Sequence, residues 1–147
     1  MTGFLIAMIS GALMSIQGVF NTDVTKSSSI WVAAGFVQLT ALAMCVVMWF
    51  VTGRPDVMAL FSVDRKYALL GGVIGAFITY TVVRSMSSLG TAKASLTIVV
   101  TQVAAAYLIE LFGLFGSEKS DFSWGKFIGL AIAIVGLVVF NMVGQDA

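Results

Sequence analysis

One carboxylate and several amides of this 147-residue sequence lie within apolar stretches, where polar side chains are costly. Glu110 stands between Ala104–Ile109 and Leu111–Phe115. A charged residue at the centre of a membrane helix costs about 2.5–3.5 kcal/mol on insertion scales, so such residues are candidates for ligand, ion or proton binding. We therefore expect Glu110 to exchange a proton or to accept a cationic group. The alternatives are an ion pair with Arg84 or another structural partner, and a location nearer the membrane interface.

Two amides of the first apolar stretch share one side of a helix. Gln17 and Asn21 are four residues apart, so both side chains project from the same face. Ser10 and Met14 extend this face into a stripe. Its polar side chains would have no hydrogen-bond partner if they faced lipid. The stripe therefore predicts that this face meets protein or water. Interhelical hydrogen bonding, typically worth about 0.6 kcal/mol in membranes, is the alternative use of the amides.

Three further side chains are candidates for the same cavity. Gln102 precedes Glu110 by eight residues, which is about two helical turns, so these two can flank one cavity at different depths. Arg84 follows Tyr80 by one turn. If both point inward, they supply a cation and an aromatic wall or hydroxyl. If they point outward, Arg84 determines topology and Tyr80 packs against other helices.

Five apolar stretches must position these residues. They span residues 4–21, 30–51, 67–84, 91–115 and 124–143, and a bilayer-spanning helix needs about 20 residues. With 59% hydrophobic residues, 10% charged residues and a mean hydropathy of +1.03, the chain has too little polar surface for a soluble globule. We expect an all-α integral membrane protein whose residues 1–147 form a single five-helix domain. No basic residue precedes the first stretch, which we expect to be a retained helix.

Composition excludes several classes of function. A net charge of +1 without a clustered basic face argues against nucleic acid as a partner. The sequence has no histidine and a single cysteine, Cys45, so the common zinc sites and the Ser-His and Cys-His catalytic sets are absent. There is no GxxxxGK[ST] motif for ATP hydrolysis. We therefore expect no enzyme, no metal and no cofactor.

The number of spans and the basic residues bear on orientation. An odd number of spans places the two termini on opposite sides of the membrane. The side with the N-terminus carries five basic residues, which are Arg54, Arg65, Lys66, Lys119 and Lys126. The other side carries Lys26, Lys93 and, if its side chain reaches that interface, Arg84. Because the margin is only two or three charges, insertion in both orientations is a hypothesis that the sequence leaves open.

Several segments also carry a family resemblance. These are Gln17-Gly18-Val19-Phe20-Asn21, Phe36 with Thr40-Ala41-Leu42, Leu89-Gly90-Thr91-Ala92, and Gln102 with Glu110-Leu111-Phe112-Gly113. In order and spacing they resemble the YdcZ-like family, the half-size, five-helix, EamA-like branch of the drug/metabolite transporter superfamily. The resemblance implies a multi-pass protein of the bacterial inner membrane that forms half of a ten-helix inverted-repeat fold. It also implies a central cavity lined chiefly by the first, third and fourth helices. Those helices carry the candidate residues Gln17, Asn21, Tyr80, Arg84, Gln102 and Glu110.

The residues and the resemblance together predict a secondary active transporter. We expect proton coupling and alternating access, a small polar or amphipathic metabolite or drug-like solute, and an antiparallel homodimer or a paralogous partner. A non-transporting membrane subunit that binds a partner through glycine strips such as Gly71 and Gly75 is one alternative. A passive channel lined by the same polar residues is another. An intramembrane enzyme ranks last, because Glu110 has no evident nucleophile beside it.

Overall fold

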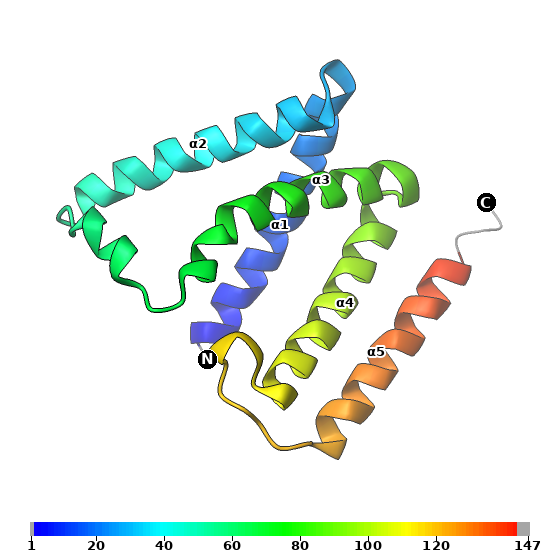
Figure 1. The fold of residues 1–147 in the computed structure, drawn as a ribbon. Helices are drawn as coiled ribbons and strands as arrows, with labels where there is room; N and C mark the ends of the chain where they lie inside the picture. The colour runs from blue at the N-terminus through cyan, green and yellow to red at the C-terminus, as the bar shows by residue number, and fades with distance from the viewer. Residues whose placement is uncertain (1, 144–147) are drawn as a thin grey trace. The chain divides into compact units, whose positions relative to one another are not determined.

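The computed structural model describes residues 2–143 and contains five α-helices that are long and apolar enough to cross a membrane (Figure 1). The helices are α1 (Thr2–Ser27), α2 (Ile30–Val51), α3 (Gly71–Leu89), α4 (Thr91–Phe112) and α5 (Trp124–Met142). Three short 3₁₀-helices lie in the connections: η1 (Val57–Ser62), η2 (Lys66–Leu70) and η3 (Leu114–Gly116). Residues 2–143 contain no β-strand. The expected all-α membrane fold is therefore confirmed.

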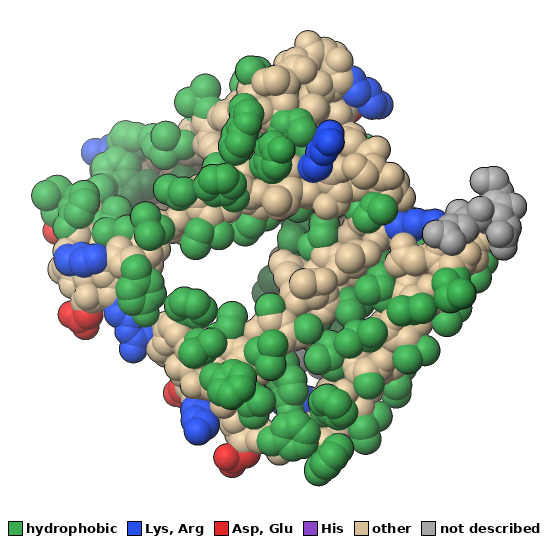
Figure 2. Space-filling model, turned by 45° about the vertical axis from the view of Figure 1, so that its right-hand side comes forward, with side chains coloured by type: hydrophobic (Ala, Val, Ile, Leu, Met, Phe, Trp, Pro, Cys, Tyr) green, Lys and Arg blue, Asp and Glu red, His purple; other side chains and the backbone are tan. Residues whose placement is uncertain are grey.

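The chain divides into two compact units, Met1–Ser88 and Leu89–Ala147. In the first unit α1 packs against α2, and α3 follows. In the second unit α4 and α5 lie side by side (Figure 1). The described part of α5 has no buried residue. Figure 2 shows hydrophobic side chains over much of the visible surface, with few basic and acidic side chains among them. Such extensive apolar exposure fits surfaces that lipid or another chain covers.

Hydroxyl side chains explain why α1 continues past Asn21 to Ser27. Thr22, Thr25 and Ser28 each donate to a carbonyl four residues earlier, at 2.8 to 2.9 Å. These bonds satisfy the hydroxyls within the helix itself, so a polar sequence can stay helical beyond the apolar stretch. In α3 the Ser88 hydroxyl likewise donates to the carbonyl of Arg84 at 2.9 Å. This helix ends at Leu89, beyond the apolar stretch that ends at residue 84.

Local caps fix the other ends. The Ser29 hydroxyl accepts the amide of Val32 at the start of α2, and this side-chain cap is a common device at helix N-termini. α4 ends at Phe112 rather than near Phe115, because Gly113 adopts the left-handed conformation at φ 63°. Glycine takes that conformation without steric cost and terminates helices for that reason. Glu110 therefore lies in the last turn of α4.

Gly18 marks the closest approach of α1 and α3. A Cβ atom built on Gly18 would lie 2.5 Å from Cε of Met86, and Met86 is 6% exposed. We expect Gly18→Leu to lower the free energy of unfolding by about 1–3 kcal/mol, because the larger side chain must displace packed neighbours. Thermal unfolding in detergent measures this. Gly11→Leu is the control, since no described atom lies within 4 Å of its Cβ position; equal effects of the two substitutions would contradict the close contact.

Candidate functional site

The polar stripe of α1 lines a groove between α1 and α2. Ser10, Met14, Gln17 and Asn21 all border this groove, which encloses about 960 Å³. The opposite wall comes from α2 and consists of Ala33, Phe36, Val37, Thr40 and Ala41. The α2 side is therefore apolar apart from Thr40, while α1 contributes two amides and the carboxylate of Asp23.

Hydrogen bonding distinguishes the amides from the other polar groups of the groove. The hydroxyls of Ser10 and Thr40 each donate to a carbonyl of their own helix at 3.0 Å. By contrast, the side-chain amides of Gln17 and Asn21 form no hydrogen bond with another described residue. Gln17 is exposed, but Asn21 is only 7% exposed. Among the described residues, the fully buried side-chain N or O atoms without a hydrogen-bond partner are Oγ of Ser95 and Oγ of Ser120, so the Asn21 amide keeps some access to the groove that it borders.

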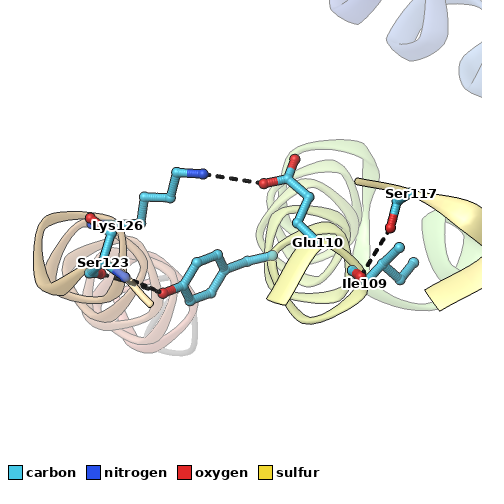
Figure 3. Close-up of polar contacts among 6 residues, drawn as sticks. Ile109, Glu110, Ser117, Ser123 and Lys126 are labelled. Atoms are coloured by element: carbon cyan, nitrogen blue, oxygen red, sulfur yellow. Dashed lines mark hydrogen bonds and ion pairs between the residues drawn. The ribbon is translucent and has the colours of Figure 1, made fainter. Parts of the chain in front are cut away.

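A second groove, of about 420 Å³, lies between α4 and α5 and contains an ion pair. Nζ of Lys126 lies 3.2 Å from Oε2 of Glu110. Figure 3 shows the two side chains pointing toward each other from α5 and α4. Their side chains are 53% and 49% exposed, respectively. Glu110 thus has a partner from the next helix, and this partner is Lys126 rather than Arg84.

The connection after α4 folds back over the helix end and brings Glu110 into place. The carbonyl of Glu110 accepts the amides of Gly113 at 3.3 Å and Ser120 at 2.9 Å. The Ser117 hydroxyl donates to the carbonyl of Ile109 at 3.1 Å (Figure 3). These bonds satisfy carbonyl groups that a helix C-terminus leaves without partners. A carboxylate is disfavoured at this end of the helix dipole, and the Lys126 ammonium offsets that cost.

Tyr107 fixes the start of α5 against α4. Its hydroxyl accepts the amide of Ser123 at 3.2 Å and lies 3.4 Å from the carbonyl of the same residue. Ser123 caps α5 by accepting the amide of Lys126. The Lys126 ammonium also lies 5.9 Å from the centre of the Tyr107 ring, within the range of a cation–π contact. Tyr107 is therefore the residue that positions Lys126 beside Glu110.

We expect Tyr107→Phe to lower the free energy of unfolding by about 1–3 kcal/mol, because the substitution removes both hydroxyl contacts and leaves backbone groups of Ser123 without them. Tyr80→Phe is a matched control. The Tyr80 ring stacks on Trp31 with centroids 4.8 Å apart, while its hydroxyl bonds to no other described residue. Thermal unfolding in detergent should show a lower midpoint for Tyr107→Phe alone. Identical midpoints for both variants would contradict the positioning role.

The other candidates lie apart from these two clusters. Arg84 and Gln102 are exposed, and neither side chain contacts another described residue through a hydrogen bond or ion pair. Lys93 instead forms a polar contact at the far end of unit two, where its ammonium donates to the carbonyl of Asn141 at 3.3 Å. Within the described residues, the structure thus places Gln17 and Asn21 along one groove and pairs Glu110 with Lys126. Sequence reasoning treated Lys126 only as a topology determinant, although its opposite charge to Glu110 was a usable signal.

Comparison with known proteins bears on what these grooves do. Residues 2–139 match the family described as "Putative inner membrane exporter, YdcZ". The chain is also 24% identical over 135 residues to "Inner membrane protein YdcZ" of Escherichia coli strain K12, across 90% of this chain and 89% of that protein. No solved structure matches the chain. Both likenesses extend over most of the chain, and the family match includes the residues of both grooves.

Proposed function

This chain belongs to the YdcZ family, and from that membership we propose that it is a proton-coupled secondary active transporter for a small polar or amphipathic metabolite or drug-like solute. It is a multi-pass inner-membrane protein, as its five apolar helices and its relatives show. The description of the family supports export as the direction. The absence of a Walker motif from the sequence supports an ion gradient rather than ATP as the energy source.

The observation that carries this proposal is the amide of Asn21. Asn21 is 7% exposed as a residue and borders the α1–α2 groove, and its amide forms no hydrogen bond with another described residue. A polar group at membrane depth that faces a groove is a candidate for solute binding. Asn21 and Gln17 orient the solute in this groove. Tyr80, Arg84 and Gln102 are further candidates for solute contact, since all three are polar residues on helices that the family resemblance assigns to the cavity.

Glu110 is the proposed coupling residue. A proton and a cationic group of the solute compete for its carboxylate, beside the Lys126 ammonium that pairs with it in this structure. Such competition couples the two movements only if Glu110 binds protons differently in the inward-facing and outward-facing states. The pair with Lys126 supports this role because it supplies a second arrangement for the carboxylate, which a change of state can favour or disfavour.

We further propose that two oppositely inserted copies form one transporter. Five spans place the termini on opposite sides, so an inverted second copy completes a ten-helix inverted pair, the architecture of many secondary transporters. The partner is a second copy of this chain or a paralogous chain. The lack of any buried residue in the described part of α5 supports a partner, because within the described residues the helix that packs against α5 is α4.

The export proposal is tested by measuring the small solutes that cells release. Cells producing the chain are compared with cells carrying an empty vector, with and without a protonophore, by mass spectrometry of the medium. We expect at least one small solute to accumulate outside several-fold and to fall back when the proton gradient is collapsed. Release that is unchanged by the protonophore and that does not saturate with solute concentration would favour a channel. No change, at verified abundance in the membrane, would favour a non-transporting subunit.

A further inference from the structure

The Glu110–Lys126 pair leaves most of its hydrogen-bonding capacity unused. A carboxylate has about four acceptor positions and an ammonium three donors, yet the pair shares one contact of 3.2 Å. Among the described residues no other hydrogen bond reaches either charged group, and each side chain is about half exposed. One wall of the α4–α5 groove therefore presents a negative and a positive group side by side, both open to further partners.

The rest of this groove is apolar. Val103, Ala106, Leu130 and Ala133 line it together with Gly129, and they lie on the sides of Glu110 and Lys126 that face the middle of α4 and α5. The groove encloses about 420 Å³, which lies within the usual range of roughly 300–1,000 Å³ for small-molecule sites. It thus combines a charged end for a head group with an apolar part for a side chain.

We propose that this groove recognises a zwitterion with an ammonium and a carboxylate on one carbon and an apolar side chain, of which an apolar α-amino acid is the simplest case. The solute ammonium contacts Glu110 and the solute carboxylate contacts Lys126. The four charges then alternate around one small ring, and the pair between the two protein groups is kept. The inference rests on the proposed function and adds the class of solute for the α4–α5 groove, a second contact site that shares no lining residue with the α1–α2 groove of Asn21 and Gln17.

The same arrangement discriminates against singly charged solutes. A cationic solute is attracted by the Glu110 carboxylate but repelled by the Lys126 ammonium. An anionic solute is attracted by Lys126 but repelled by Glu110. Only a solute with both charges converts each protein group into an attractive partner. Discrimination of this kind comes from the repulsive contact as much as from the attractive one.

Three matched probes test this inference: L-leucine, 3-methylbutylamine, which lacks the carboxylate, and 4-methylpentanoate, which lacks the ammonium. Each is titrated against the purified chain in detergent, with the thermal unfolding midpoint and calorimetry as readouts, since a ligand of the folded state raises that midpoint. We expect L-leucine to bind at least about tenfold more tightly than either analogue, the size of effect that one unpaired or repelled charge produces. Equal binding of all three, or no binding of L-leucine up to about 10 mM, tenfold above the usual range of KM, overturns the inference.

Variants distinguish recognition from a purely structural ion pair. Glu110→Gln should shift the preference to 4-methylpentanoate, and Lys126→Met should shift it to 3-methylbutylamine. The charge swap that combines Glu110→Lys with Lys126→Glu should restore the preference for L-leucine and guards against a single variant that fails to fold. A structural pair would instead change stability and leave the order of the three probes unaltered, which contradicts the inference.

Two glycine substitutions, one inside the groove and one outside it, test whether the space in the groove is needed for binding. Cβ positions of Gly129 and Gly136 have no described atom within 4 Å, but only Gly129 lines this groove. Gly129→Leu should abolish L-leucine binding and Gly136→Leu should preserve it; the reverse result contradicts the proposed site. A chain that binds L-leucine but exports nothing overturns the transport proposal alone, whereas export without L-leucine binding overturns this inference alone.

Discussion

An Asn21→Leu variant is expected to fold and to export at least about tenfold less solute than the wild-type chain. Asn21 is 7% exposed as a residue and its amide forms no hydrogen bond with another described residue, so a leucine of similar size removes no hydrogen bond within the described residues and should not lower the unfolding midpoint. The same change removes the group that we propose orients the solute. Export is measured as the extracellular level of solutes that accumulate only when the wild-type chain is present.

Gln38→Leu serves as the control for this prediction. The Gln38 amide lies 3.1 Å from the Cβ position of Gly75, outside the α1–α2 groove, and we expect that variant to keep its export. A lower unfolding midpoint for Asn21→Leu would show that the amide has a structural partner. Unchanged export would remove Asn21 from the proposed solute site.

The second large effect is expected for Glu110→Gln, which should lose the part of export that depends on the proton gradient. Glutamine keeps the size of the side chain and one acceptor oxygen, but it replaces the other oxygen with an amide donor, carries no charge and exchanges no proton at this position. Hydrogen bonds to charged groups are worth about 1.5–3 kcal/mol, so we expect a loss of roughly tenfold to a hundredfold. Export is measured at matched membrane abundance, with and without a protonophore.

Glu118→Gln makes the identical chemical change nearby in sequence. Glu118 is exposed in the connection after α4, and it should keep the wild-type dependence on the proton gradient. The coupling role of Glu110 is wrong if Glu110→Gln folds, reaches the membrane and retains that dependence.

The sequence predicted helices best where an apolar run and a cap coincide. The second apolar stretch, residues 30–51, agrees with α2 at both ends, because Ser29 caps its start and a polar connection follows Val51. The fourth stretch was predicted to continue to residue 115, since Leu114 and Phe115 are apolar. Hydropathy cannot show a backbone reversal. The signal was Gly113, whose left-handed conformation ends the helix.

The site was harder to predict, because apolar periodicity does not say which helices become neighbours. A spacing of four residues predicted the common face of Gln17 and Asn21. It could not predict that Asn21 is buried and Gln17 exposed, because the spacing does not say how closely neighbouring helices approach each residue. Likewise, the isolation of Glu110 on its own helix suggested a lone carboxylate. Its partner Lys126 reaches it only because the intervening connection folds back.

Thiol labelling in intact cells tests the claim of two oppositely inserted copies most directly. In a Cys45→Ala chain, single cysteines are placed by Ser28→Cys, between α1 and α2, and separately by Asp64→Cys, between α2 and α3. These positions lie at opposite ends of α2, and both are exposed. An impermeant maleimide reports which of them faces outward. Inverted homodimers predict that about half of each cysteine is labelled, whereas full labelling at one position and none at the other would contradict them.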